Sequence, residues 1–279
     1  MIRRSLAIGL LTLTPLAAIP AQKAAPPERI TFSYADLADL ALPAQVAAQV
    51  RVKEAIPLGK DQAAGVPAGR TRYYVEADVT SLIRGPIGLP ARLSYLTDLP
   101  NAADSSTKLK NKAEYLVLAN PVAGRAGELK LVDKDAHIPW TAELGQRIRS
   151  LLKEAVAPNA APQIVGVGNV FHVAGTLPGE SESQLFLQAA DGRPVSISVL
   201  RRPNQAPSWA VALGEIVDEA AGPPAPDSLL WYRLACTLPR QLPDQSLADV
   251  DAENANALRA DYALVMEKLG SCARNRKRS

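Results

Sequence analysis

The chain is poor in the residues that most often carry catalysis or bind metals. Its 279 residues include two histidines, His137 and His172, and two cysteines, Cys236 and Cys272. A zinc site of the His/Cys kind needs three or four ligands, usually with a short chelating pair, and the spacing of these four residues offers none. The sequence therefore predicts no metal site, with both histidines held by local hydrogen bonds.

Catalytic and cofactor motifs are also missing. There is no G-x-S-x-G nucleophile elbow, and Gly166-Val167-Gly168 lacks the third glycine and the following helix of a dinucleotide fingerprint. We therefore expect no cofactor and favour a non-enzymatic protein. One enzymatic alternative stays open, a hydrolase with a site near residues 172–183 that uses Ser181 or Ser183 with His172.

Aromatic residues make up only 5% of the chain, whereas 47% of it is hydrophobic. Such a composition predicts an aliphatic core and argues against global disorder. The candidate binding residues are three aromatic side chains of the C-terminal half and one acid on an otherwise apolar strand: Trp209, Trp231, Tyr232 and Glu215. The alternatives are burial of the aromatics in the core and a solvent-facing Glu215, which, if it faced inward, would need Arg201 or Arg202 as a partner.

No basic excess remains in the body of the chain. Six cations lie near its two ends, Arg3, Arg4, Arg274, Arg276, Lys277 and Arg278. Without these six, the rest of the chain has 25 of the 31 Lys and Arg residues and all 28 Asp and Glu residues, which gives it a net charge of −3. This balance argues against nucleic acid as a partner. We interpret the basic residues at 271–279 as a solvated tail. The alternatives are contact with an acidic partner and contact with anionic lipid, of which the second would make this an envelope-surface-associated structural protein.

The apolar run near residue 1 is too short for a membrane span. A basic pair, Arg3-Arg4, is followed by apolar residues from Leu6 to Ala18 and then by small residues, which is typical of a secretory signal peptide cleaved near Ala18 or Ala21. We therefore expect a periplasmic or secreted protein with no transmembrane span in its mature form. General and twin-arginine export both stay open.

Export makes a disulfide plausible, because disulfides persist in oxidising compartments. A Cys236–Cys272 bridge would close a loop of 36 residues and stabilise the fold by roughly 3–4 kcal/mol in the chain-entropy model. The alternative is a pair of buried thiols that do not meet.

Alternation of apolar and polar residues predicts a mainly β (α+β) protein with two domains. The strongest strand pattern is 71–84, and Asp191-Gly192 lies between two alternating runs, as in a β-hairpin. Further strands are expected at 113–119, 209–217 and 229–238, and a helix from Ser246 to about Leu269. The expected organisation is a signal peptide (1–21), an N-terminal segment with a short helix (22–43), a barrel-like domain closed by helix 141–156 (44–157), a linker (158–163), a second antiparallel β domain with a C-terminal helix (164–270) and a basic tail (271–279).

Two features of the first domain carry a family resemblance. The strand at 71–84 ends in Arg84-Gly85, and Tyr115-Leu116-Val117-Leu118 is followed by a return strand at 129–132. Residues 45–135 thereby resemble an OB-type barrel of the netrin-like (metalloproteinase-inhibitor) kind. The disulfides of that family are missing, including the cysteine near the mature N-terminus that is used for inhibition, so the resemblance implies a barrel and not that activity.

Taken together, the sequence predicts a small OB-like barrel joined to a second antiparallel β domain. The expected function is a non-enzymatic interaction or ligand-binding role, with another envelope protein or a small ligand as the partner. The sequence does not indicate an oligomeric state.

Overall fold

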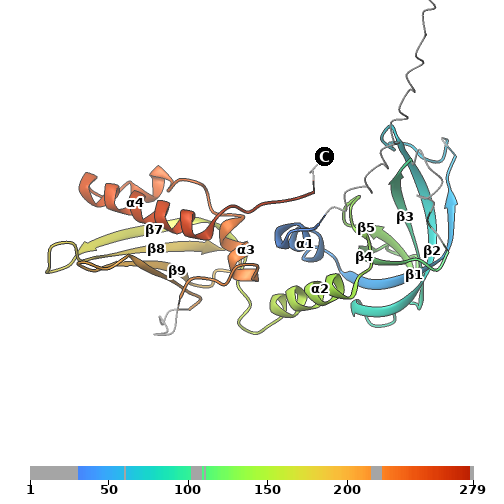
Figure 1. Ribbon diagram of the computed structural model, residues 1–279, viewed down its shortest axis with the longest axis horizontal. Helices are drawn as coiled ribbons and strands as arrows, with labels where there is room; N and C mark the ends of the chain where they lie inside the picture. The colour runs from blue at the N-terminus through green and yellow to red at the C-terminus, as the bar shows by residue number, and fades with distance from the viewer. Residues whose placement is uncertain (1–30, 60, 102–108, 110, 215–221, 277–279) are drawn as a thin grey trace, which may run out of the picture. The chain divides into compact units, whose positions relative to one another are not determined.

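Five strands close into a small barrel in the first half of the protein (Figure 1). The structure, a computed structural model, describes residues 31–59, 61–101, 109, 111–214 and 222–276. The barrel strands run in the order β1-β2-β3-β5-β4, and pairing of β1 with β4 closes the barrel. Their bounds are β1 (Val46–Pro57), β2 (Arg70–Arg84), β3 (Arg92–Pro100), β4 (Glu114–Pro121) and β5 (Glu128–Leu131). The predicted OB-like barrel is confirmed.

Strand β1 makes this closure because it pairs on both of its edges. One edge runs antiparallel to β2 and the other to β4, and the pairing with β2 shifts register at three places along the strand. Such irregularities coil a strand, which lets one long strand follow a curved sheet. Small or β-branched side chains, among them Val50, Ala77 and Val117, are fully buried in the barrel core.

Two helices cover the outward face of β4, and a short strand pairs with its edge. Helix α1 (Tyr34–Ala41) begins with a capping box between Ser33 and Asp36, and α2 (Ala142–Ala155) is capped by Thr141. The apolar stripe of α2 packs with α1 and with Leu116 and Leu118 in one buried cluster. Strand β6 (His137–Pro139), which pairs with β4, was not predicted, because three residues are too few to show alternation.

Four antiparallel strands form the second sheet, in the order β10-β9-β8-β7. They are β7 (Ile164–Ala174), β8 (Ser181–Ala189), β9 (Val195–Arg201) and β10 (Ser208–Ala212). The predicted hairpin at Asp191-Gly192 joins β8 to β9, and Gly192 has the positive φ (76°) that this turn needs. Strand β10 ends at Ala212, so residues 215–217 of the predicted strand, Glu215 among them, lie outside the described residues.

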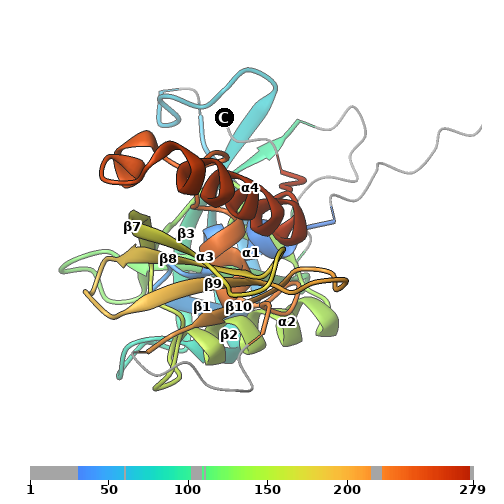
Figure 2. The same cartoon turned by 90° about the vertical axis from the view of Figure 1, so that its left-hand side faces the viewer.

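Helix α4 (Ala252–Leu269) lies over one face of this sheet (Figure 2). It begins at the cap residue Asp251, so the predicted start at Ser246 is wrong: Asp244–Leu247 forms a separate 3-10 turn, η2. The predicted strand at 229–238 is also wrong, because Leu229–Ala235 is helix α3, capped by Ser228. The periodicity of a short apolar run does not distinguish a strand from a buried helix. Here the Ser228 cap favours the helix.

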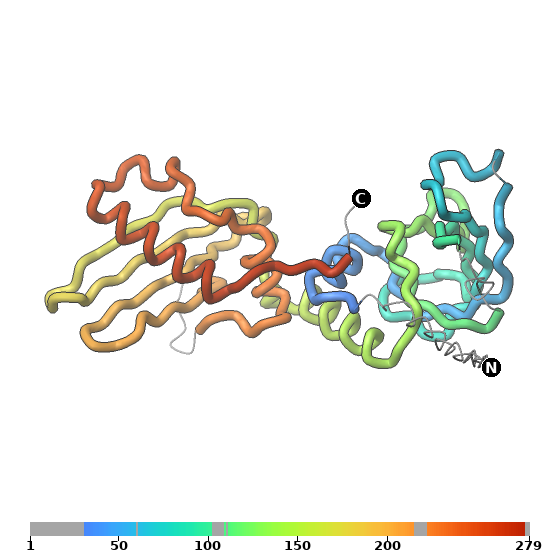
Figure 3. Tube along the Cα trace, turned by 45° about the horizontal axis from the view of Figure 1, so that its top comes forward, coloured from blue at the N-terminus to red at the C-terminus, as the bar shows by residue number. Residues whose placement is uncertain are grey.

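The segment after α4 is held in place. Cys236, at the end of α3, and Cys272 have their sulfur atoms at disulfide distance, 2.03 Å, as the predicted pairing requires. Residues 271–276, which we call the strap, continue to α1 (Figure 3), where Arg274 and Arg276 form ion pairs. The prediction of a solvated tail is therefore wrong for the described part of the tail.

Residues 158–163 join α2 to β7 without regular structure, and the domain boundary proposed there stays a prediction. We call residues 32–157 the barrel half and 164–276 the sheet half. Among the described residues, no helix has both the length and the hydropathy to span a bilayer.

Candidate ligand-binding sites

A cavity opens in the barrel wall where β3 and β5 separate. These parallel strands pair only at Ser94 with Glu128 and at Tyr95 with Leu129. Beyond this point lies a cavity of about 690 Å³, which we call the barrel-seam pocket. Its lining comes from β2, β3, the β4–β5 connection, β5 and the segment after β5: Arg72, Tyr74, Tyr95–Asp98, Val122, Arg125, Glu128–Leu131, Asp133 and Lys134.

Two lining residues hold polar atoms that are buried and unbonded. The Tyr95 Oη and Thr97 Oγ1 atoms have no hydrogen-bond partner among the described residues, and the two residues are only 1% and 2% exposed. Both lie on β3, at alternate positions that face the barrel interior with Leu93. Native proteins rarely leave such groups unsatisfied, since each costs about 1–3 kcal/mol.

His137 is a third unsatisfied group near this position. Its ring stacks on Tyr115 at a centroid distance of 3.9 Å and lies 5.6 Å from the Tyr95 ring. Neither ring nitrogen has a partner within the described part of the chain, so the predicted local hydrogen bond is wrong for His137. Burial lowers the pKa of His137 to about 3, because the charged imidazolium would lose its hydration, and the ring is therefore neutral at pH 7.

The rim of the barrel-seam pocket is charged, with most charges neutralised locally. Arg72 Nε lies 2.7 Å from Asp98 Oδ1, and Arg125 Nη1 lies 3.0 Å from Glu128 Oε1. Among the described residues, Lys130 and Lys134 form no ion pair. An anionic group at this rim would therefore meet uncompensated positive charge.

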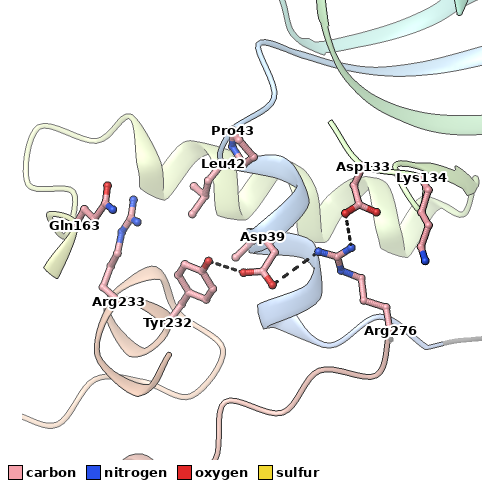
Figure 4. A pocket seen from close by; sticks show the side chains of 10 residues that line it. Asp39, Leu42, Pro43, Asp133, Lys134, Gln163, Tyr232, Arg233 and Arg276 are labelled. Atoms are coloured by element: carbon pink, nitrogen blue, oxygen red, sulfur yellow. Dashed lines mark hydrogen bonds and ion pairs between the residues drawn. The ribbon is translucent and has the colours of Figure 1, made fainter. Parts of the chain in front are cut away.

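The strap contributes to a second cavity, at the junction of α1, α3 and the residues after β5 (Figure 4). Arg274 Nε lies 2.6 Å from Asp39 Oδ2. Arg276, only 7% exposed, has carboxylates of Asp133 at 3.1 Å, Asp36 at 3.6 Å, and Asp39 and Asp135 at 3.8 Å. Acidic residues of the barrel half thus neutralise the cations that the sequence suggested were solvated.

About 630 Å³ of this junction pocket is open beside the strap. The predicted binding residue Tyr232 lies here, and its Oη donates to Asp39 Oδ1 over 2.7 Å. Burial, together with this hydrogen bond to a carboxylate, raises the pKa of Tyr232 to about 12. Tyr232 is therefore a neutral donor that helps to position Asp39. The full lining is Ala38, Asp39, Leu42, Pro43, Asp133, Lys134, Gln163, Tyr232, Arg233 and Arg276.

The two predicted tryptophans lie together in a third cavity, of about 470 Å³. Trp209 from β10 and Trp231 from α3 line it with a proline-rich segment and the end of α4. Trp209 is 9% exposed, and Trp231 Nε1 donates to the Leu269 carbonyl over 2.8 Å. The structure thus brings the two tryptophans together but places Tyr232 in the junction pocket, while Glu215 lies outside the described residues.

Two residues of the predicted hydrolase alternative, His172 and Ser183, belong to a partly buried hydrogen-bond chain, whereas Ser181, at the start of β8, forms no hydrogen bond with His172 among the described residues. His172 Nδ1 lies 2.8 Å from Ser183 Oγ, and Ser183 Oγ donates to Asp261 Oδ2 over 2.6 Å. Asp261 also pairs with Arg201, whose Nε lies 2.7 Å from Oδ1. The single hydroxyl proton of Ser183 is directed at Asp261, so Nδ1 must donate to Oγ. His172 therefore has no proton to take from Ser183, and Ser183, with no exposed surface, is closed to a substrate. The predicted local hydrogen bond is confirmed for His172.

Reasoning from sequence missed both the barrel-seam pocket and the junction pocket. One signal was present for the first: the alternation Leu93, Tyr95, Thr97 places hydroxyl groups on the inward face of a strand. No signal marked the second, because it depends on contacts between α1 and residues more than 190 positions later. Among the described residues, no group of three or more metal-ligating side chains is suitably placed to hold a metal ion.

No protein-family model matches the chain, and no curated protein sequence matches it.

Proposed function

We propose that the protein is an exported, non-enzymatic ligand-binding protein whose binding site is the barrel-seam pocket. Export is supported by the leader pattern at residues 1–21. It is also supported by the disulfide distance between Cys236 and Cys272, because such pairs persist in oxidising compartments such as the periplasm.

The observation that carries the binding role is the pair of unsatisfied groups beside the cavity. Tyr95 Oη and Thr97 Oγ1 have lost their water without gaining a partner in the described chain. A bound molecule with hydrogen-bonding atoms would replace the hydrogen bonds to water that the two hydroxyl groups lost on burial. In the sheet half, by contrast, Ser183 and Asp261 satisfy each other, so no ligand is needed there.

The position of the pocket on the barrel agrees with this role by analogy. In OB-type barrels the face formed by the second and third strands is a common binding surface. Here Tyr74 of β2 and Leu96 of β3 line the pocket. The analogy concerns the fold alone and does not identify a ligand.

The lining indicates the kind of ligand. A cavity of about 690 Å³ falls within the range typical of small-molecule sites. Tyr74, Leu96 and Leu131 offer apolar surface, and Lys130 and Lys134 carry positive charge at the rim. Of the two partner classes expected from the sequence, these features favour a small ligand, partly apolar and anionic, over another envelope protein.

The test uses 8-anilinonaphthalene-1-sulfonate, an anionic and partly apolar fluorophore. We expect the folded wild-type protein to bind it with a fluorescence increase. Leu96→Glu should weaken binding at least about tenfold, because it places a negative charge in the pocket and removes apolar surface.

Leu82→Glu is the matched control. Leu82 and Leu96 are both 47% exposed and both lie on barrel strands, but Leu82 does not line the pocket. Equal loss of binding in both variants, or no binding by the wild-type protein, would contradict the proposal.

A further inference from the structure

Arg233 is a half-buried cation that lacks a counter-ion. It lies on α3 and lines the junction pocket. Its guanidinium forms no hydrogen bond or ion pair with any described residue, and its Nε atom is buried without a partner. Its guanidinium lies over the Tyr232 ring, whose centroid is 5.9 Å away, and it also interacts electrostatically with Tyr34. Desolvation lowers the pKa of Arg233, which is the sign of a cation that burial has not compensated.

The other two cations of the junction pocket differ from Arg233. Arg276 is surrounded by carboxylates, and Lys134 is exposed, so water stabilises its charge. Removal of water from a charge costs much less when an anion replaces the water. Within the described lining, Arg233 is thus the desolvated cation at which a bound anion would gain most.

The surroundings of Arg233 suit a carboxylate with an aliphatic body. A guanidinium presents parallel N–H groups that match the two oxygens of a carboxylate. Figure 4 shows the Gln163 amide at the same end of the pocket as Arg233, where it offers a further donor. Ala38, Leu42 and Pro43 add an apolar wall.

We propose that the junction pocket is a second binding site, specific for a small aliphatic carboxylate that is held by Arg233 and Gln163. Asp133 and Lys134 line both this pocket and the barrel-seam pocket, but Arg233 and Gln163 line the junction pocket alone. The proposal does not depend on the function proposed for the barrel-seam pocket. The proposal concerns reversible binding of the carboxylate and includes no covalent step.

Calorimetric titration of the full protein with hexanoate, acetate and sulfate tests the proposal. We expect hexanoate to bind more tightly than acetate, because its chain covers the apolar wall, and sulfate to bind weakly. Arg233→Gln should weaken hexanoate binding at least about tenfold, through loss of a charge-assisted bidentate contact. Arg240→Gln, which removes an exposed arginine outside the pocket, should leave affinity unchanged.

Urea unfolding separates loss of the site from loss of the fold. Arg233→Gln removes an uncompensated cation, so its unfolding midpoint should equal or exceed that of the wild type. Leu96→Glu, in the barrel-seam pocket, should leave hexanoate affinity unchanged. Wild-type protein that does not bind hexanoate, sulfate that binds as tightly as hexanoate, or Arg233→Gln protein that keeps full affinity would each overturn the proposal.

Discussion

The barrel interior and the interface between the second sheet and α4 bury polar side chains in opposite ways. At the sheet, His172, Ser183, Asp261 and Arg201 form one continuous chain of hydrogen bonds. In the barrel, Tyr95, Thr97 and His137 are buried with no partner for their polar atoms among the described residues. A satisfied network stabilises a structure, whereas an unsatisfied one marks a place where something else can bind. A triad-like set of residues is therefore structural here, and an inconspicuous strand carries the candidate site.

The largest expected effect comes from breaking the satisfied network. Asp261→Ala leaves the Ser183 hydroxyl and the Arg201 guanidinium without their acceptor. We expect a loss of about 2–4 kcal/mol in the free energy of unfolding, less than for a fully buried ion pair because the Arg201 side chain is 37% exposed and can rehydrate. Urea denaturation followed by circular dichroism measures this loss.

The control for Asp261→Ala is Asp244→Ala, which breaks an exposed pair with Arg259 that involves the same helix. Exposed pairs contribute little, so its unfolding midpoint should stay at the wild-type value. If the two variants lost similar stability, the network would not stabilise the sheet half as described.

The free energy of unfolding should depend on pH through His137, the unsatisfied imidazole of the barrel. The pKa of His137 is about 3 in the folded state and 6.5 ordinarily, so between these values the unfolded chain binds more protons. Stability therefore falls as the pH drops below 6.5, by about 1.4 kcal/mol per pH unit from this group, or about 2 kcal/mol at pH 5.

A His137→Phe variant isolates this contribution, because Phe keeps an aromatic ring on Tyr115 but takes up no proton. We expect urea midpoints of the variant to decline less than those of the wild type between pH 6.5 and pH 5. Parallel declines would show that His137 takes up a proton as readily in the folded state as in the unfolded state, which would contradict the lowered pKa.

The smallest effects come from removing single hydroxyl groups. Tyr95→Phe deletes a buried hydroxyl that lacks a partner, and in ligand-free protein it should raise the free energy of unfolding by about 1 kcal/mol. Ser183→Ala deletes a hydroxyl with two partners and should cost about 1–2 kcal/mol. Urea denaturation measures both changes. If Tyr95→Phe lost more stability than Ser183→Ala, the unsatisfied side chains would lie at the sheet and the satisfied ones in the barrel, the reverse of the contrast between the two regions.

Local patterns predicted the elements better than they predicted the sites. β-branched and aromatic composition indicated the barrel strand at 71–84, and a continuous apolar run indicated the strand at 113–119. Alternation indicated the hairpin at Asp191-Gly192, because half-buried strands show their two faces directly in the sequence. Leu229–Ala235 was misassigned because a buried short helix has the same apolar run as a strand. Pairing of Cys236 with Cys272 could be inferred because only one pairing of two cysteines exists.

The sites depend on contacts that no local pattern encodes. Asp39 meets Tyr232 and Arg274 across 193 and 235 positions of sequence, and charge composition alone led us to expect a solvated tail. The barrel-seam pocket arises where β3 and β5 stop pairing, a property of strand register and not of any one residue. Trp209 and Trp231 were each candidate binding residues by residue type, but the cavity that they share follows from the unforeseen helix α3.

The strap also makes the junction pocket depend on contacts between the two ends of the described chain. Asp36 completes the cap of α1 within its own first turn, yet its carboxylate also accepts the backbone N–H of Arg276, 240 positions later. Contacts between segments so far apart in sequence form only when folding brings the two segments together. Because the strap supplies Arg276 to the lining, the complete pocket is a property of the folded chain that neither segment has by itself.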